Sequence, residues 1–488
     1  MTTARVAEIG TRRKAPRGQI RILFGPDAHL TVATNPLAHP VEALLWGLGE
    51  TLTRVGSDGS IQPWLAESVT HLDHNTWRVK LRPNARFWDG SAVTAEAVAS
   101  SVRANWETQI ATDFMLSKKT ELVIVDPLTL ELVTPEPTGG VHSTLSYHQL
   151  IVQKNRGALM TGPYRPVEYL PDRLLVLEPF LDHWDGIPPL ERITIEHEPD
   201  IEKRLAALAT GEADVLYGLQ PEALARLSGE GCDVDWSITN RVHYLQFNLN
   251  RPPLDERAVR EALCYAIDRQ ALLKRVFHGY GAAAGGVFPA EAGVPVAEVQ
   301  RIDRTQAAHL LDAAGWLSGP DGIRSKGGQR LAFTINTFPQ RAEMTPLANA
   351  VAEQVRPLGF DISVEEVPNI GERTKHGDFD AAMRSINTLI SGDPYFLLAI
   401  TLGRNGRENT GSYLNEEVER LLPHLKAELD EKRRQDLALQ IQEQLHHDPP
   451  NAYLLVAPLI TVSRRGAVAG FHPDRFTQYF ITNKMARP

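Results

Sequence analysis

The chain has 488 residues, a mass of 54.1 kDa and a formal net charge of −9, with 23% charged and 42% hydrophobic residues. At roughly 150 residues per domain this length predicts about three domains, and the composition excludes a disordered or fibrous chain. No apolar run approaches the ~20 residues that cross a bilayer, and 51 basic against 60 acidic residues give no field that favours nucleic acid.

Residues 1–18 are basic and polar, and they lack the apolar segment of a secretory signal. We expect them to form a disordered tail. Two locations stay open. Either an export signal has been removed from this numbering and the protein is periplasmic or on the cell surface, or the protein stays in the cytoplasm.

The first half of the chain alternates short strands with turns and capped helices. Apolar residues alternate with polar ones over 76–81, which predicts a half-buried strand. Thr94 is the predicted N-cap of a helix over 95–106. Asp200 is the predicted N-cap of a second helix, which continues through 208 and is ended by Gly211. The other strands predicted in this half are 19–24, the hairpin 121–125 and 129–133, 174–178, 192–197 and 215–217.

The second half contains longer helices between strands, so we predict an α/β or α+β protein. The longest predicted helix, 255–277, has an apolar stripe along one side. Further helices are predicted at 305–314, 346–358, 416–422 and 431–445. Further strands are predicted at 241–248, 331–337, 361–367, 379–386 and 453–462.

Motifs for catalysis or for a resident metal are missing from the sequence. There is no H-E-x-x-H, G-x-S-x-G or Walker loop. The glycine-rich segment 279–286 follows a helix and opens none, so it predicts a turn rather than a nucleotide loop. His446-His447-Asp448 is interpreted as a polar helix end, with a metal site as the alternative. Cys232 and Cys264 favour two free thiols, with a disulfide as the alternative.

Several phrases, in their order along the chain, resemble the large solute-binding proteins of ABC importers, the oligopeptide-, dipeptide- and nickel-binding family. These sequence motifs contain Asp-Gly and Gly-Pro turns, tryptophans and the start of one amphipathic helix. They are SDGSIQPWLAES at 57–68, TW at 76–77, LRPNARFWDGS at 81–91, TGPY at 161–164, HWDG at 183–186, GEAD at 211–214, FNLNRPP at 247–253 with DERAVREALCYAIDR at 255–269, DAAGW at 312–316 and GDP at 392–394. Each phrase alone is weak, whereas their shared order is specific.

The resemblance implies an α/β, two-lobed periplasmic-binding-protein-like fold with an extra subdomain and with hinge strands between the lobes. Lobe I is expected at 19–48, 165–245 and 462–488, the extra subdomain at 49–164, and lobe II at 246–461. The four tryptophans of the phrases are expected to pack under the turns. They are Trp64, Trp77, Trp88 and Trp184.

The implied function is that of a monomer that captures a small polar solute by closing its lobes and delivers it to an ABC permease in the membrane. The solute would be a short peptide, an opine-like compound or a metal chelate such as a nickel complex. No catalysis, cofactor or nucleic acid is implied, and a metal would arrive only inside a bound chelate. The alternative is a cytoplasmic ligand sensor or an enzyme recruited from the same fold, because fold alone does not settle function.

The sequence departs from the ligand pockets of this family. In peptide-binding members, a carboxylate just before the Gly-Asp-Pro turn holds the amino group of the peptide. Ile390 stands at about that place here, which puts ordinary dipeptide binding in doubt because a buried amine without a partner is costly. Asp393 is interpreted as part of the turn rather than as a substitute.

In nickel-binding members, arginines and tryptophans hold the metal chelate. The tryptophan positions fall near Phe114 and Thr388 of this chain, and the arginine positions near Ala111 and His148. That pocket is therefore not reproduced residue for residue either.

Six residues are the remaining candidates for contact with a ligand: His148, Tyr244, Asn387, Thr388, Arg404 and Asn409. For both His148 and Tyr244 a structural role in the core is the favoured interpretation, with ligand contact as the alternative. In the loop 403–411 two arginines stand beside amides, which suits carboxylate binding, while a solvated basic turn is the alternative. If the loop binds ligand, Arg404→Ala is expected to weaken binding by more than about tenfold without lowering the melting temperature.

Overall fold

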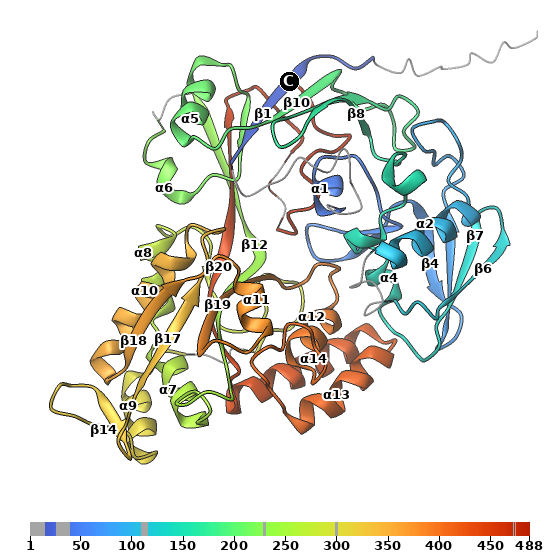
Figure 1. Ribbon diagram of the computed structural model, residues 1–488. Coiled ribbons are helices and arrows are strands. Elements are labelled where there is room, and N and C mark those ends of the chain that lie inside the picture. The colour runs from blue at the N-terminus through green and yellow to red at the C-terminus, as the bar shows by residue number, and fades with distance from the viewer. Residues whose placement is uncertain are drawn as a thin grey trace, which may run out of the picture.

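A computed structural model describes residues 15–25, 40–108, 116–227, 231–297, 301–471, 473 and 475–488. Its main feature is one long mixed sheet that extends through two lobes, with a separate subdomain beside them (Figure 1). The strand order is β18-β17-β19-β12-β20-β11-β1-β10-β9-β8, and β13 pairs with β20. Among the described helices, none combines the length and apolarity needed to span a bilayer.

Lobe I is built around β1, whose parallel neighbours are β10 and β11. Its elements are β1 (Gln19–Phe24), α1 (Pro40–Leu45), β8 (Tyr164–Leu170), β9 (Leu174–Pro179), β10 (Arg192–His197), α5 (Ile201–Thr210), β11 (Val215–Tyr217) and α6 (Pro221–Leu224). The predicted ends of α5 are confirmed. Asp200 accepts a hydrogen bond from the backbone N–H of Glu202, and Gly211 takes the left-handed conformation that ends the helix.

The extra subdomain contains an antiparallel sheet in the order β4-β5-β7-β6 and a two-stranded ribbon. Its elements are β2 (Thr53–Val55), β3 (Ile61–Pro63), β4 (Ala66–His71), β5 (Thr76–Leu81), α2 (Ala95–Thr108), β6 (Glu121–Asp126), β7 (Thr129–Val133), α4 (Val141–Thr144), η2 (His148–Leu150) and η3 (Asn155–Gly157). The alternating strand is confirmed, because Trp77, Val79 and Leu81 are all buried in one core under α2. Thr94 Oγ1 accepts from the N–H of Ala97, 3.2 Å away, as predicted for the cap of α2.

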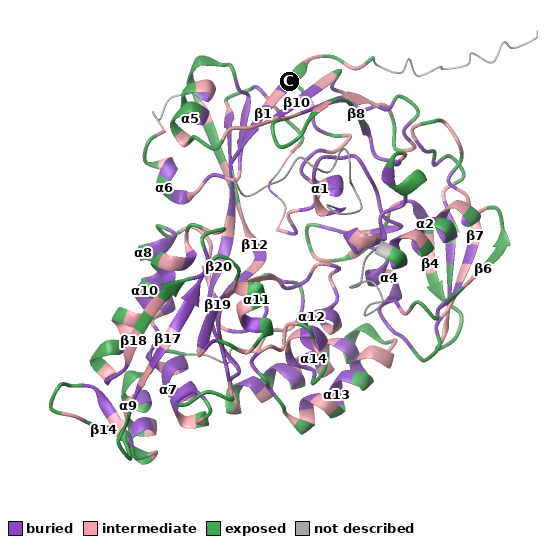
Figure 2. Cartoon of the chain, in the orientation of Figure 1, coloured by how far each residue is buried: buried purple, intermediate pink, exposed green. Residues whose placement is uncertain are grey.

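Lobe II has a parallel part of the sheet and two groups of helices. Around the sheet lie α7 (Arg257–Ala266), α8 (Arg269–Val276), β13 (Ala282–Ala283), α9 (Arg304–Ala313), β17 (Ala332–Thr337), α10 (Met344–Val355), η4 (Arg356–Leu358), β18 (Asp361–Glu366), α11 (Ile370–Lys375) and β19 (Ala381–Asn387). A small sheet contains β14 (Leu317–Ser318), β15 (Arg324–Lys326) and β16 (Gln329–Arg330). The second group is α12 (Pro394–Leu402), α13 (Glu416–Ala427) and α14 (Glu431–His447). Figure 2 shows β17 largely buried, and the first three residues of β19 are buried as well, consistent with their place in the core of this lobe.

Two strands, β12 (Cys232–Phe247) and β20 (Asn451–Arg464), run side by side through both lobes (Figure 1). Their first and last residues, 232–238 and 458–464, pair in lobe I, and β12 pairs with β19 in lobe II from 241 onward. Only 241–248 of this strand was predicted from the sequence. The preceding segment holds Asp233 and Asp235, which are disfavoured in strands, and pairing with β20 overrides that preference.

The predicted single helix 255–277 is wrong in one respect, because the structure breaks it between α7 and α8. Ile267 is extended, and Asp268 starts a new helix by accepting a hydrogen bond from the N–H of Ala271 at 2.9 Å. The backbone N–H of Asp268 bonds instead to Gln354 Oε1 of α10 at 2.8 Å. A short polar side chain that caps the backbone favours such a break over a continuous helix.

The disulfide alternative is excluded, since Cys232 and Cys264 are both free. The segment 279–286 forms the predicted turn and also the short strand β13, which was not predicted. A Cβ at Gly281, whose φ is +85°, would lie 2.4 Å from the carbonyl oxygen of Val456, so this close approach to β20 requires glycine. His446 and His447 lie in the last turn of α14, and the described residues contain no group of metal-ligating side chains.

Candidate functional site

The crossing of the two hinge strands defines the candidate site. The β12–β20 pairing shifts register between Ile238 and Val242, which frees the backbone at 239–241 from regular pairing. Across from it stands Pro458, which has no N–H to give to the sheet. Thr239 Oγ1 bonds the carbonyl oxygen of Ala457 at 2.7 Å and bridges the irregular region. The strands are thus held together here but are locally irregular, as a hinge requires.

A cleft with a cavity of about 190 Å³ opens at this crossing. Its walls come from the segments that follow the carboxyl ends of β1, β11 and β17, together with α1 and the hinge strands. Because β1 and β17 belong to parallel parts of the sheet in different lobes, the cleft lies where ligands bind in open α/β sheets. A solute of a few heavy atoms in this cleft would contact both lobes.

The cleft has charged side chains on the lobe II side. Arg241 of β12, and Arg341 and Glu343 before α10, all line it. Glu343 Oε1 lies 3.8 Å from Arg341 Nη1 and 3.3 Å from His243 Nε2. His243 is fully buried, and burial lowers its pKa. Burial of Glu343 opposes its ionisation, but the contacts with His243 and Arg341 outweigh this and lower the pKa of Glu343 to about 2.

A second group of side chains joins the extra subdomain to lobe II. Tyr147 and Phe396 pack with ring centroids 5.7 Å apart, and the Arg407 guanidinium stands 5.9 Å from the Phe396 ring centroid. His148 is buried beside Tyr147, at 4.3 Å between rings, and its Nδ1 has no hydrogen-bond partner in the described part of the chain. Burial lowers the pKa of His148 to about 3, so its ring is neutral at pH 7.

The loop after α12 separates its two arginines. Arg404 is exposed, and its backbone N–H bonds Glu419 Oε1 of α13 at 2.5 Å. Arg407 instead stands over Phe396, toward the subdomain. Asn409 is used by the loop itself, because its side chain bonds the backbone of Gly403 and Tyr413 at 2.8–3.0 Å. The structure therefore brings Arg407, and not Arg404, next to the aromatic group.

The remaining candidates lie along the strands near the crossing. Asn387 pairs with Arg241 at the end of β19. Thr388 is buried, and its N–H and Oγ1 both donate to the carbonyl oxygen of Asn240 at 2.8 and 3.0 Å. Tyr244 is buried in the lobe II core against Tyr453. Asn387 and Thr388 thus lie beside the crossing of the hinge strands, whereas Tyr244 packs in the core below it.

Asp393 is engaged within the protein. Its Oδ1 accepts from the N–H of Tyr395 at 2.8 Å, which caps α12, and its Oδ2 forms an ion pair with Arg434 of α14. Ile390 contributes a carbonyl oxygen that accepts from Gln478 Nε2 at 3.2 Å. Ala111 and Phe114 lie outside the described residues.

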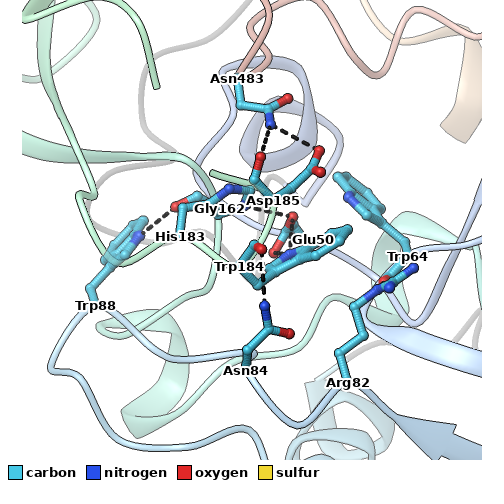
Figure 3. Close-up of polar contacts among 10 residues, drawn as sticks. All are labelled: Glu50, Trp64, Arg82, Asn84, Trp88, Gly162, His183, Trp184, Asp185 and Asn483. Carbon is cyan, nitrogen blue, oxygen red and sulfur yellow. Dashed lines mark hydrogen bonds and ion pairs between the residues drawn. The ribbon is translucent and has the colours of Figure 1, made fainter. Parts of the chain in front are cut away.

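The turn phrases of the sequence meet around one buried carboxylate, Glu50 (Figure 3). Its Oε1 lies 3.1 Å from His183 Nε2 and accepts from Trp184 Nε1 at 3.0 Å. Arg82 stacks on the Trp184 ring at 4.4 Å, and Trp88 Nε1 donates to the carbonyl oxygen of Gly162 at 3.0 Å. These residues contact one another, so the phrases build the junction between lobe I and the subdomain, although His183 Nδ1 has no hydrogen-bond partner in the described part of the chain.

Arg241, Arg341 and Glu343 were not predicted from the sequence, whereas Arg407 is one of the two arginines of the predicted loop 403–411. A signal for two of them was present: Arg341 and Glu343 follow the carboxyl end of a parallel strand, β17, where ligand-binding loops gather. Arg241 carried no signal, because the register shift that exposes it depends on pairing with β20, more than two hundred residues away.

Two lobes joined by hinge strands, with a solute-sized cleft at the crossing, define a solute-binding protein of the periplasmic-binding type. The model of the bacterial extracellular solute-binding proteins, family 5, matches residues 60–408, and the chain belongs to this family. It is a family of ABC-transport binding proteins rather than of enzymes.

Relatives and solved structures agree with the family. The nickel-binding periplasmic protein of Escherichia coli is 30% identical over 359 residues, which cover 68% of each chain. The glutathione-binding protein GsiB of Pectobacterium atrosepticum is 27% identical over 428 residues, covering 82% of this chain and 81% of that one. The structure of NikA from Brucella suis in complex with Fe(III)-EDTA superposes with a TM-score of 0.84 at 22% identity, covering 96% of this chain and all of that one. The fold is therefore shared throughout.

Proposed function

We propose that this protein captures a small solute bearing carboxylate groups in the cleft at the hinge crossing and delivers it to an ABC permease. One observation carries the proposal: Arg241 of a hinge strand and Arg341 of lobe II line the same cleft. Guanidinium groups bind carboxylates with two parallel hydrogen bonds, which gives both affinity and orientation. Arg407 stands over Phe396 on the subdomain side, outside the lining of this cleft, and we propose that it reaches the solute when the lobes close.

The mechanism is closure of the lobes around the solute. Because the walls of the cleft come from both lobes, a solute held by Arg241 and Arg341 and touching the β1 and β11 ends stabilises the closed form over the open one. No covalent step is needed. The protein would act as a monomer outside the cytoplasmic membrane, which agrees with the extracellular role of its family.

The relatives support this choice of solute. Glutathione, which the Pectobacterium relative is named for, carries two carboxylates, and nickel can be carried as a chelate of carboxylate ligands. Opines also carry several carboxylates. The shared chemistry of these solutes is the carboxylate, which the guanidinium groups of Arg241 and Arg341 can bind in a cleft that Glu42 and Glu343 also line.

Native mass spectrometry of the purified protein tests the proposal first, because a retained solute adds mass directly. Calorimetric titration with glutathione, a nickel–histidine chelate and octopine follows, with small-angle scattering on the same samples. We expect at least one of them to bind and to reduce the radius of gyration. We also expect Arg341→Ala to weaken that binding by about tenfold or more, while Arg330→Ala, which removes an exposed arginine paired with Asp321, leaves it unchanged. Absence of any bound or binding solute would overturn the proposal.

A further inference from the structure

The chain crosses between the lobes again in its C-terminal segment, at 475–480. Phe476 is buried in the apolar cluster of α12, α13 and α14 in lobe II. Phe480 is buried in the lobe I cluster, with its ring centroid 4.7 Å from that of Tyr217. Thr477, between the two rings, lines the cleft. The segment is therefore a strap along the cleft that is anchored in both lobes.

Arg475 stands at the lobe II end of this strap and is bound to the hinge. Its carbonyl oxygen accepts a hydrogen bond from the backbone N–H of Asn240 at 2.9 Å. Asn240 lies in the part of β12 where the pairing with β20 shifts register. Because this hydrogen bond ties the strap to the irregular part of the hinge, a bend of the hinge strands carries the backbone of Arg475 with it.

The side chain of Arg475 joins the extra subdomain to lobe II. Its Nη2 atom donates to the carbonyl oxygen of Ser57, in the turn of the β2–β3 ribbon. Its Nη1 atom donates to the carbonyl oxygen of Glu291, in the loop after β13. The same loop is attached to α14, because Gln442 Nε2 donates to the carbonyl oxygen of Pro295 at 3.0 Å. One guanidinium thus connects the ribbon turn to the helices of lobe II.

The β2–β3 ribbon is also packed closely on lobe II. Val55 is 2% exposed and Ile61 is partly buried, and both belong to the lobe II cluster that contains Leu389. An added Cβ at Gly293 would lie 3.1 Å from the carbonyl oxygen of Asp58, so the loop and the ribbon turn approach closely. Because the subdomain is attached to lobe I, opening the cleft draws the ribbon away from lobe II and exposes this apolar surface. The contact therefore favours the closed form.

We propose that Arg475 is a positioning residue for closure. It holds the ribbon turn against lobe II and links this contact to the bend of the hinge at Asn240, without touching the solute. A guanidinium suits this role, because its planar fork donates to two carbonyl groups in fixed directions, whereas a lysine ammonium is a compact point charge. The inference rests on the proposed function and deepens it, since it names a residue that sets the population of the closed form.

Hydrogen exchange of the solute-free protein tests the contact directly. Peptides that cover the ribbon turn, 56–60, and the loop, 289–294, report on its two sides. We expect Arg475→Ala to raise the exchange rate of both peptides about tenfold, because two hydrogen bonds across the contact are lost. A peptide from α7 should keep its wild-type rate. Small-angle scattering of the same sample should show a larger radius of gyration than that of the wild type.

Two further variants separate this role from a general loss of charge. Arg475→Lys keeps the positive charge but cannot reach both carbonyl groups in the same way, so both peptides should still exchange faster than in the wild type. Arg86→Ala is the matched control, because Arg86 donates to the carbonyl oxygen of Gly90 at 2.9 Å within a single turn of the subdomain. It should exchange and scatter like the wild type. Thermal unfolding checks that each variant folds, and where Arg475→Ala does not, Arg475→Lys decides.

The kinetics of solute binding provide the second readout. For whichever of glutathione, the nickel–histidine chelate and octopine binds the wild type, Arg475→Ala should raise the dissociation rate about tenfold and change the association rate less than about twofold. Loss of a contact that forms only on closure acts in this way, because the solute enters the open form.

The outcomes that contradict the inference are specific. Wild-type exchange at either peptide in Arg475→Ala, or full recovery in Arg475→Lys, overturns it. Faster exchange with an unchanged radius of gyration also overturns it, because the contact is then local and does not control closure. If none of the three solutes binds, the proposed function falls, whereas exchange and scattering of the solute-free protein still decide whether Arg475 controls closure.

Discussion

Arg434 of α14 donates through Nη2 to Oδ2 of Asp393, the residue that caps α12, and the two side chains are only 2% and 8% exposed. The Nη1 atom of Arg434 also donates to the carbonyl oxygens of Leu425 and Glu428, 2.7 and 2.9 Å away, at the end of α13. One buried guanidinium therefore connects three helices of lobe II.

Removing this guanidinium is expected to destabilise the protein strongly. Arg434→Met leaves Asp393 buried without its partner, and an unpaired buried charge costs about 3–5 kcal/mol. The free energy of unfolding from urea titration measures the change. Arg275→Gln is the control, since it breaks a fully exposed pair with Glu353 and should leave the urea midpoint unchanged. Equal midpoints for the two variants would contradict the role of the buried pair.

The two arginines of the loop after α12 are expected to differ in their effect on binding. Arg407→Ala removes the guanidinium over Phe396 and should weaken solute binding by about tenfold. Arg404→Ala removes an exposed side chain next to α13 and should change the dissociation constant less than about twofold. Titration of both variants with the solute found for the wild type measures this. A stronger effect of Arg404→Ala would restore the expectation drawn from the sequence alone.

Gly139 is expected to control closure between the extra subdomain and lobe II. Its N–H donates to the carbonyl oxygen of Lys426 at 2.7 Å, and an added Cβ would lie 1.8 Å from the carbonyl oxygen of Glu428. Gly139→Ala therefore forces the two parts apart and should both weaken solute binding and increase the radius of gyration with solute present.

Gly371→Ala serves as the control for Gly139→Ala. Gly371 lies in α11 and has no positive φ. The atom nearest to an added Cβ would be 3.4 Å away. We expect wild-type scattering from this variant. Should Gly139→Ala also scatter and bind like the wild type, the contact with the end of α13 is not needed for closure.

His148 is expected to make the stability of the protein pH-dependent. Its pKa is lowered from 6.5 to about 3 by burial, so the unfolded chain binds a proton that the folded chain does not. The contribution is complete above pH 6.5 and is lost as the pH falls toward 3. Between pH 6 and pH 4 the slope from one such group approaches about 1.4 kcal/mol per pH unit.

The difference between wild type and His148→Gln isolates this slope. Urea unfolding of both proteins at pH 7, 6, 5 and 4 should show the wild type losing stability faster than the variant. His309→Gln, which removes an exposed histidine, should follow the wild type. Parallel curves for wild type and His148→Gln would show that the ring is not buried in solution.

Local signals predicted much of the secondary structure. The alternation in β5 and the caps at Thr94 and Asp200 depend on near neighbours, so they can be read from a few residues. The break between α7 and α8 could not be read in this way, because Asp268 gains its backbone partner from Gln354 on another helix. The first part of β12 was missed for the same reason, since its partner strand is β20.

The sequence by itself determined the family and the class of fold, because the turn phrases follow one another in the order of the family, whose model matches residues 60–408. Only the tertiary structure decided which charged side chains share the cleft. Arg241 and Glu343 are about a hundred positions apart, and they meet because β12 and β17 belong to one sheet through β19. Complementarity to a solute depends on the distances between these charged side chains. Those distances are set by the folded chain and cannot be read from the order of the residues.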